Sequence, residues 1–414
     1  MGRGGARGRH RRQLSMAFFA ARAGRARLTA SAQATQRVRE LRAAGVDIVS
    51  LTQGEPDFNT PDHVIEAAYR AMHAGQTHYT PVDGTPELKE AIAAKFRREN
   101  GIACTPANVS AGAGGKQVLY NALMATLDAG DEVLIPAPSW IAYADITQFA
   151  EGTPRWIETR PENGFKLRPE DLERAITPRA KWLILNSPSN PSGAVYTADE
   201  LRALAAVLER HPALWLISDD IYEHVLFDGR PFATMAAIAP QLAARILTVN
   251  GASKAFAMTG WRLGYACGPV ELIRAMARMQ GQSSLNPSSV SQAAAVAALT
   301  GPMDVVMARC DEFQARRDVI VPKLEAVPGL TLTLPHGAFY IYVSCAQWIG
   351  RRTPQGSILD NDTQVADYLL ESGVAVPGGA GYGLSPYFRV SFATSLANLD
   401  QACRRIDAAG RGLY

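Results

Sequence analysis

The sequence predicts an α/β fold in two domains: a three-layer α/β/α domain with a mostly parallel sheet, and a smaller α+β domain. The chain has 414 residues, which is long for a single hydrophobic core. From residue 60 to 300 apolar strand-like runs alternate with helical patterns, and this alternation is typical of a parallel or mixed sheet between helices. After residue 301 the regular alternation of predicted strands and helices ends. We therefore expect a large domain at 60–300 and a small domain from 25–59 and 301–414.

Six runs in the first part are candidate strands, and several of them are nearly continuous in hydrophobic residues, as strands covered on both faces tend to be. They are 132–138, 154–159, 181–188, 214–220, 246–252 and 262–268. Three helical patterns lie among them, at 60–75, 85–101 and 197–211. The first two open with Thr-Pro, a predicted N-cap followed by proline at the first helical position. The third opens with a capping box from Thr197 to Glu200.

The second part predicts a different order of elements. A long helix at about 303–326 precedes two strands, and the remaining helices and strands then alternate. The strands are 330–335, 338–344, 374–378 and 387–393, and the helices are 363–372 and about 397–409. The segment 346–362 is polar and rich in turn residues, so we expect a surface loop there.

Composition is that of an ordinary soluble globular protein, with 47% hydrophobic and 20% charged residues. No apolar run approaches the roughly 20 residues of a membrane span, and a net charge of +3 is too small to indicate nucleic acid. Five scattered cysteines and seven dispersed histidines predict no metal site and reduced thiols in the cytoplasm.

Residues 1–39 hold ten arginines and neither Asp nor Glu. We interpret residues 1–24 as a disordered basic tail, or as the product of a start assigned upstream of Met16. The alternatives are an organelle-targeting peptide, because these are rich in arginine and poor in acids, and a weak contact with nucleic acid.

Lys254 follows the predicted strand 246–252 and lies among Gly251, Ala252 and Ser253, with Arg262 eight residues later. Burial lowers the pKa of an amine, and a neutral amine attacks a carbonyl to form a Schiff base. The fork of N–H donors on an arginine suits a phosphate. The pair therefore indicates an aldehyde that carries a phosphate, namely pyridoxal phosphate. The alternative is a solvated lysine on a surface turn.

Other polar groups follow neighbouring strands, where ligands of open α/β sheets bind. Asp219 is assigned to a protonated pyridine nitrogen, and Asp220 to local structure, with helix capping as the alternative for one of the two. Tyr222 and Asn190 are candidates for hydrogen bonds to a ring oxygen. The alternative for the segment around Asn190, which is rich in Pro and Ser, is a simple turn.

Three further features fit a cofactor or its substrate. The glycine-rich segment 111–123 opens a helix whose free N–H groups favour a phosphate, although it lacks P-loop spacing and can be a plain helix start. Trp140 is either a core residue or a stacking partner for a ring. Arg389 lies in an apolar strand and requires an anionic partner, either a substrate carboxylate or a structural Asp or Glu.

With these residues in hand, the sequence resembles the class I pyridoxal-phosphate aminotransferases of fold type I, closest to the bacterial aspartate and aspartate/prephenate aminotransferase branch. The resemblance covers nearly all of the chain from about residue 25. The motifs that carry it, in order, are "LTQGEPDFNTP", "HYTPVDGTPELKEAI", "GGKQ", "NSPSNPSGAVY", "SDDIYEH", "ASKAFAMTGWRLGYACGP", "GAFY" and "YFRVSFATS".

The resemblance implies a role for each matching residue. Lys254 forms the Schiff base with the cofactor and then moves a proton, Asp219 pairs with the pyridine nitrogen, and Trp140 stacks on the ring. Tyr222 and Asn190 bond the ring hydroxyl. The implied phosphate ligands are Gly115, Ser253, Arg262 and, from the other subunit of a homodimer, Tyr79. The implied substrate ligands are Arg389 and Gly54 for the α-carboxylate, and Lys116, which also adjoins the cofactor, for a distal carboxylate.

The sequence departs from the family pattern at two places. Many relatives have serine at the position of Gly251, so one phosphate bond is missing. Many aspartate aminotransferases have an arginine in the segment that here spans 279–308, which contains none. Selectivity for dicarboxylates is then expected to rest on Lys116 and on Arg27, at a position where some relatives have lysine.

We therefore expect an aminotransferase that moves an amino group from an L-amino acid, aspartate or another acidic or aromatic donor, to 2-oxoglutarate. One alternative is a pyridoxal-phosphate β-lyase on the same fold. The other is a cofactor-binding regulator without enzyme activity, which the short segment 1–25 disfavours because it has no room for a DNA-binding domain.

Overall fold

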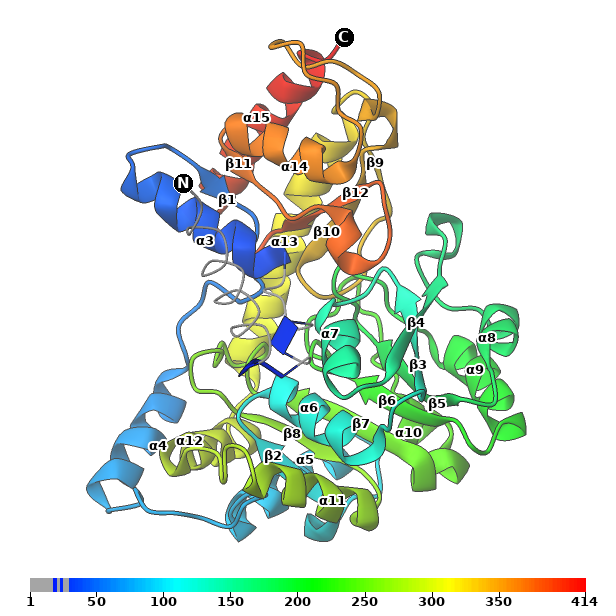
Figure 1. Cartoon of the computed structure of the whole chain (residues 1–414). Coiled ribbons are helices and arrows are strands. Elements are labelled where there is room, and N and C mark those ends of the chain that lie inside the picture. Colours follow the sequence, from blue (N-terminus) through cyan, green and yellow to red (C-terminus); the bar gives the residue numbers. More distant parts are fainter. Residues whose placement is uncertain (1–17, 21–22, 25–29) are drawn as a thin grey trace, which may run out of the picture.

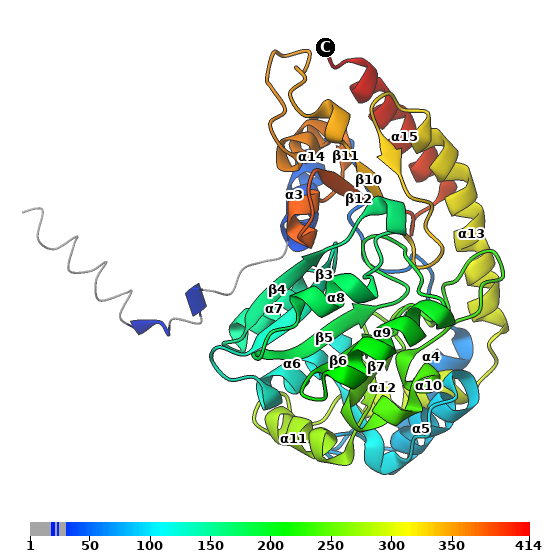
Figure 2. The same cartoon turned by 90° about the vertical axis from the view of Figure 1, so that its right-hand side faces the viewer.

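The computed structural model describes residues 18–20, 23–24 and 30–414. A larger part is built on a seven-stranded sheet, and a smaller part has sheets of three and two strands (Figure 1). The long helix α13 (Asp304–Glu325) runs along the side of the molecule and joins the two parts (Figure 2). The described residues contain no single helix long and apolar enough to cross a membrane. Only α12 (Ser289–Thr300) and α13 taken together pass on length and composition, and they meet at 81°.

The seven-stranded sheet has the order β2-β8-β7-β6-β5-β3-β4. Its strands run parallel from β7 to β4, while β8 is antiparallel to both of its neighbours. Their bounds are Val109–Gly112 (β2), Glu132–Ala137 (β3), Thr153–Glu158 (β4), Ala180–Asn186 (β5), Trp215–Asp219 (β6), Ile246–Gly251 (β7) and Gly264–Cys267 (β8). Because β8 runs the other way, its first residue lies at the edge where the parallel strands end.

Side chains of these strands alternate between two hydrophobic cores, one on each face. Leu134 and Leu183 belong to one core, and Ile135 and Ile184 to the other. Helices that cover the first face are α4 (Asp62–His73), α5 (Pro86–Asn100), α8 (Pro169–Ala175), α9 (Ala198–Arg210), α10 (Met235–Ile238) and α12 (Ser289–Thr300). The second face is covered by α6 (Gly115–Thr126), α7 (Ala142–Phe149) and α11 (Val270–Gly281).

The smaller part has a core of its own. Its sheets are β12-β10-β9, which is antiparallel, and the parallel pair β1-β11. The strands are Val49–Ser50 (β1), Thr331–Leu332 (β9), Tyr340–Ser344 (β10), Val374–Ala375 (β11) and Tyr387–Ser391 (β12), and the helices besides α13 are α3 (Ala30–Ala43), α14 (Asp362–Glu371) and α15 (Leu396–Arg411). The predicted domain boundaries stay a prediction, as does the nature of residues 1–24.

Short 3-10 helices complete the secondary structure, at Pro106–Asn108, Pro161–Asn163, Pro240–Arg245, Ala346–Trp348 and Gly379–Tyr382. The predicted strands and helices of the larger part are all present. Two cap predictions are also confirmed, because Thr85 accepts from Leu88 N at 3.2 Å and Thr197 forms a capping box with Glu200.

Several local predictions are wrong. Thr60 does not cap α4: its hydroxyl donates to the Ala257 carbonyl at 3.0 Å and accepts from the Trp261 indole at 2.9 Å, so a tertiary contact takes the capping group. Strand β2 was missed because its residues, VSAG, are small and carry no apolar signal. The segment 346–362 is only partly a surface loop, since Trp348 and Leu359 are buried.

Candidate active site

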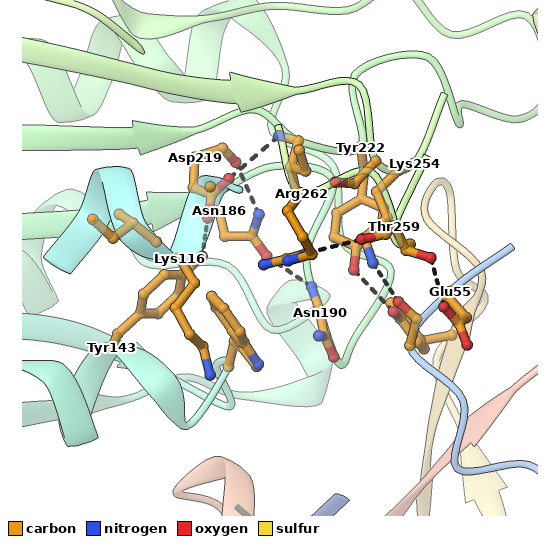
Figure 3. Close-up of a pocket in the computed structure, with 17 residues that line it drawn as sticks. Glu55, Lys116, Tyr143, Asn186, Asn190, Asp219, Tyr222, Lys254, Thr259 and Arg262 are labelled. Atoms are coloured by element: carbon orange, nitrogen blue, oxygen red, sulfur yellow. Dashed lines mark hydrogen bonds between the residues drawn. The ribbon is translucent and has the colours of Figure 1, made fainter. Parts of the chain in front are cut away.

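The carboxyl edge of the large sheet brings the predicted site residues together. Asn186 at the end of β5 pairs in register with Asp219 at the end of β6, which pairs with Val249 of β7. A cavity of about 440 Å³ opens over this edge (Figure 3). Of the predicted residues, those that line it are Gly54, Gly115, Lys116, Trp140, Asn190, Asp219, Tyr222, Ser253, Lys254 and Arg262.

Lys254 follows β7 in a turn and reaches into the cavity from the large sheet (Figure 3). Its ammonium donates a hydrogen bond to the carbonyl of Gly54 and lies 5.7 Å from the ring centroid of Tyr222. Burial lowers the pKa of the Lys254 amine to about 8, although the nearby carboxylate of Glu55 opposes the shift. A substantial fraction of this amine is thus neutral, and nucleophilic, at mildly alkaline pH.

Asp219 ends β6 with its carboxylate buried in the cavity wall. The Tyr143 hydroxyl donates to its Oδ2 at 2.6 Å, and the Ile221 N–H donates to its Oδ1 at 3.3 Å. Burial raises the pKa of the Asp219 carboxyl from 3.8 to about 6, in spite of these two donors. Such a carboxylate is stabilised by any cationic N–H that a ligand offers.

Asp220 lies in local structure, as expected, but the alternative of a helix cap is wrong. No helix begins after β6, where residues 221–224 form turns, so neither aspartate is a helix cap. The Ser218 hydroxyl donates to Asp220 Oδ1 at 2.7 Å, and the Glu223 N–H donates to its backbone carbonyl at 2.9 Å. Asp220 therefore fixes the turn that directs Tyr222 into the cavity.

The start of α6 meets the start of β8 with almost no space between their backbones. A Cβ on Gly264 would lie 2.1 Å from the Gly115 nitrogen, and one on Gly114 would lie 2.5 Å from the Arg262 guanidinium. The first N–H groups of a helix have no partner within it, so this end of α6 is suited to an anion. Arg262 adds a guanidinium here and has a φ of 53°, a strained left-handed conformation for an arginine.

The departure at Gly251 also has a structural cause. A Cβ there would lie 3.1 Å from the Leu263 carbonyl and 3.1 Å from the Ile221 side chain. This chain packs β7 against the residues before β8 too closely for a serine without some adjustment.

Trp140 and Lys116 form the opposite side of the cavity. The Lys116 ammonium lies 5.0 Å from the Trp140 ring, a cation–π contact, and the Trp140 ring meets Tyr143 edge to face at 5.4 Å. Burial lowers the pKa of the Lys116 ammonium, while Asp145 raises it and Arg262 lowers it further. Trp140 is therefore a cavity residue and not a member of the closed core.

Arg389 is buried on β12 beside the cavity, although it is not among the lining residues. It donates to Asn190 Oδ1 at 3.1 Å and to the Thr52 carbonyl at 2.6 Å, and its Nε has no hydrogen-bond partner among the described residues. Both of its partners are neutral, so the structural Asp or Glu that we considered does not pair with it. A buried guanidinium with only neutral partners favours an anionic ligand.

Tyr79 lies apart from the cavity of this chain. Tyr79 is 87% exposed and lines a separate surface pocket, so within this chain it is far too exposed to be a cavity residue. Arg27 lies outside the described residues. Among the described residues, the group of Glu99, Glu223 and His224 has metal-like spacing, but the Lys95 ammonium forms ion pairs with both of its carboxylates.

Sequence reasoning missed several cavity residues. Tyr143 appears in the sequence as an ordinary member of an apolar segment, and its hydroxyl group carries no local signal. Tyr340 ends the quoted motif "GAFY", which was a usable signal, but no role was assigned to it. Glu55 accepts a 2.6 Å hydrogen bond from Thr259, which ties the loop after β1 to the segment after Lys254. Glu55 had a usable signal, because it lies within the quoted motif "LTQGEPDFNTP" next to Gly54.

An α/β sheet that gathers an amine, guanidinium groups and a buried carboxylate around one cavity defines an enzyme that acts on small anionic molecules. The family of class I and class II aminotransferases matches residues 46–406. The chain belongs to this family, and it is an aminotransferase.

Similar proteins agree. The aspartate/prephenate aminotransferase of Cereibacter sphaeroides is 53% identical over 96% of this chain and 100% of its own length. The crystal structure of the aspartate aminotransferase from Rhizobium meliloti superimposes with a TM-score of 0.93 at 50% identity, covering 96% of this chain and 99% of the other. That of Thermus thermophilus with maleate gives 0.88 at 43% identity, covering 94% and 99%. The predicted fold class and family are thereby confirmed.

Proposed function

We propose that this aminotransferase uses pyridoxal 5′-phosphate to transfer the amino group of aspartate, or of another acidic or aromatic L-amino acid, to 2-oxoglutarate. The observation that carries the proposal is the shared cavity of Lys254 and Asp219: an amine with a lowered pKa and a carboxylate with a raised one. Opposite shifts of this kind are typical of groups that handle protons.

The residues present fit this cofactor. The tight junction of Gly114 and Gly264 leaves the helix N-terminus open to a phosphate, and Arg262 lies against it. Asp219 offers a buried carboxylate to a protonated ring nitrogen, and Trp140 offers an aromatic face. Tyr222 and Asn190 offer polar atoms to the ring oxygen, and Ser253 a further group to the phosphate.

When bound, the cofactor supplies an aldehyde for the amino group and a ring that withdraws electrons from the substrate Cα. Lys254 would hold the cofactor covalently, and its amine, once displaced by the substrate, would carry the proton from the substrate Cα to C4′, the aldehyde carbon of the cofactor. The lowered pKa of the Lys254 amine suits this task, because it lies near the working pH. Asp219 keeps the ring nitrogen protonated. Movement of the smaller part of the molecule over the cavity would exclude water.

Arg389 is proposed to bind the substrate α-carboxylate through its unpaired side, near the Gly54 backbone. Lys116 is proposed to bind the distal carboxylate of an acidic donor, with Arg27 as a second cation. The Thermus thermophilus relative with maleate, a dicarboxylate, supports a preference for acidic substrates. Trp140 and Tyr143 offer aromatic surface to a larger donor.

We further propose a homodimer in which Tyr79 of each subunit reaches the phosphate in the partner's cavity. The proposal follows from the resemblance to the family, and the 87% exposure of this tyrosine in the single chain leaves its hydroxyl available to a second subunit.

The test is a coupled product analysis with purified protein. Aspartate and 2-oxoglutarate are supplied with pyridoxal phosphate, and glutamate is measured, because a β-lyase would not form glutamate. A scan of amino donors follows the absorbance of the bound cofactor, with Lys254→Ala as the control. The proposal is wrong if the protein stays colourless after soaking in pyridoxal phosphate, or if Lys254→Ala transaminates at the full rate.

A further inference from the structure

The hydroxyl groups of Tyr222 and Tyr340 lie 2.9 Å apart, although 118 positions separate the two residues in the sequence. Tyr222 belongs to the turn after β6 of the large sheet, and Tyr340 begins β10 of the smaller part. Both are buried, and both line the cavity. The pair is therefore a direct contact between the two parts of the molecule at the site itself.

Tyr340 also supports a second site residue. The guanidinium carbon of Arg389 lies 4.5 Å from the centroid of the Tyr340 ring, within cation–π distance. Tyr340 thus contacts both the residue proposed to bond the ring oxygen of the cofactor and the residue proposed to bind the substrate carboxylate. Neither contact was visible in the sequence.

The direction of the hydroxyl contact follows from the number of protons available. Burial raises the pKa of both phenols, to about 12 for Tyr340, so both are neutral at working pH. Each phenol has one proton to donate. Because Tyr222 is proposed to donate its proton to the ring oxygen of the cofactor, it accepts from Tyr340 in the 2.9 Å contact. The charged groups facing the pair are Arg389, Glu55, Asp219 and Lys254.

We propose that Tyr340 is a positioning residue for the transamination reaction: its hydroxyl donates to Tyr222 and thereby turns the Tyr222 proton toward the ring oxygen of the cofactor, while its ring supports Arg389. The inference rests on the proposed function. A hydroxyl that accepts a hydrogen bond becomes a stronger donor, so Tyr340 strengthens the bond that Tyr222 makes.

The experiment is a pH titration of the visible absorbance of the holoenzyme. Donors to the ring oxygen stabilise its negative charge and lower the apparent pKa of the chromophore. Tyr340→Phe keeps the ring under Arg389 and removes only the hydroxyl, so we expect the chromophore pKa to rise by on the order of half a unit. We expect kcat to fall by roughly 3- to 10-fold with KM nearly unchanged, because one neutral hydrogen bond is lost.

A double-variant cycle separates positioning from structure. Tyr222→Phe should raise the chromophore pKa more than Tyr340→Phe does, and the double variant should match Tyr222→Phe alone, since Tyr340 acts only through Tyr222. Tyr342→Phe is the matched control: it removes another buried hydroxyl from β10, one that donates to the Leu384 carbonyl at 2.5 Å, and it should leave the titration unmoved.

Additive shifts in the double variant, or an unmoved titration in Tyr340→Phe, would overturn the inference while leaving the proposed function intact. A wild-type protein without a chromophore would overturn both. Incorporation of 3,5-difluorotyrosine at position 340 gives a second test that preserves shape. It makes the phenol more acidic and a better donor, so the chromophore pKa should move down; an upward shift contradicts the inference.

Discussion

The hydroxyl of Tyr143 donates a 2.6 Å hydrogen bond to Oδ2 of Asp219, and both side chains are buried. Burial and this hydrogen bond act in opposite directions on the Asp219 carboxyl: the first raises its pKa and the second lowers it. The balance leaves the carboxyl with a pKa of about 6, so its charge changes close to physiological pH. Tyr143 therefore helps to set the ionisation of Asp219, the proposed partner of the ring nitrogen.

Removal of that hydroxyl should weaken cofactor binding in a manner that depends on pH. Tyr143→Phe raises the pKa of Asp219 above about 6, so less of the carboxylate is ionised near neutral pH. We expect the Kd of the apoenzyme for pyridoxal phosphate to rise roughly 3- to 10-fold at pH 6.5, as loss of one hydrogen bond to a charged group implies. At pH 8.5 the loss should be smaller, because Asp219 is ionised in both proteins. Equal losses at the two pH values would contradict this account.

The raised pKa of the Asp219 carboxyl should also make the free energy of unfolding of the apoenzyme depend on pH. Its folded pKa of about 6 lies above the ordinary value of 3.8, so the folded chain binds more protons than the unfolded chain in this window. Its contribution to stability is then present below about pH 4 and is lost as the pH rises through 6. Asp219→Asn should gain about 2 kcal/mol relative to wild type between pH 4 and pH 7 in urea unfolding. A constant difference between the two proteins would contradict the assigned pKa.

Covalent attachment of the cofactor to Lys254 should follow the ionisation of its amine. Because the pKa of this amine is lowered to about 8, the rate at which apoenzyme takes up pyridoxal phosphate, trapped with borohydride and read by mass, should rise with pH and level off above about 8. Glu55→Gln removes the carboxylate that raises this pKa and should move the midpoint to lower pH. Lys254→Ala should not be labelled at all, and a midpoint near the ordinary lysine value would refute the prediction.

Gly114 should be more sensitive to a methyl group than a second glycine of similar conformation. Gly114 and Gly130 have φ values of 87° and 97°, so alanine at either position costs about 1 kcal/mol of backbone strain. Only at Gly114 does the added Cβ clash, at 2.5 Å from Arg262. We expect Gly114→Ala to raise the Kd for pyridoxal phosphate about tenfold or more, and Gly130→Ala to leave it unchanged. The Kd values would be measured by absorbance titration. Equal values for the two variants would contradict the proposal that the junction of Gly114 and Gly264 binds the cofactor phosphate.

A variant of Arg389 should show whether substrate binding needs the geometry of the guanidinium or only its positive charge. Arg389→Lys keeps the positive charge but loses the planar fork that binds a carboxylate through two bonds. We expect the KM for aspartate to rise roughly 100-fold, the loss typical of a buried charged contact. The absorbance spectrum of the bound cofactor should change little, since Arg389 does not line the cofactor cavity. A KM within a factor of two of wild type would argue for another carboxylate ligand.

Much of the fold followed from local patterns. Several strands of the large sheet were predictable because they are nearly continuous apolar runs, and Thr197 with Glu200 marked a helix start. Lys254, Asp219 and Asn190 stood out because each is polar and directly follows such a run. Strand β2 was not predictable, since the small residues of Val109–Gly112 form a strand only through pairing with β8.

By itself, the sequence determined the class of fold, the order of its elements and the polar residues at the strand ends, because hydrophobic periodicity and chain order are local properties. Only the tertiary structure decided that Tyr143 meets Asp219, that Tyr340 meets Tyr222 and that the hydrogen-bond partners of Arg389 within the described ranges are neutral. These contacts span 76 and 118 positions for the two tyrosine pairs. A buried hydroxyl group acquires its partner, and a buried charge its environment, from the packing of distant segments, which no local pattern encodes.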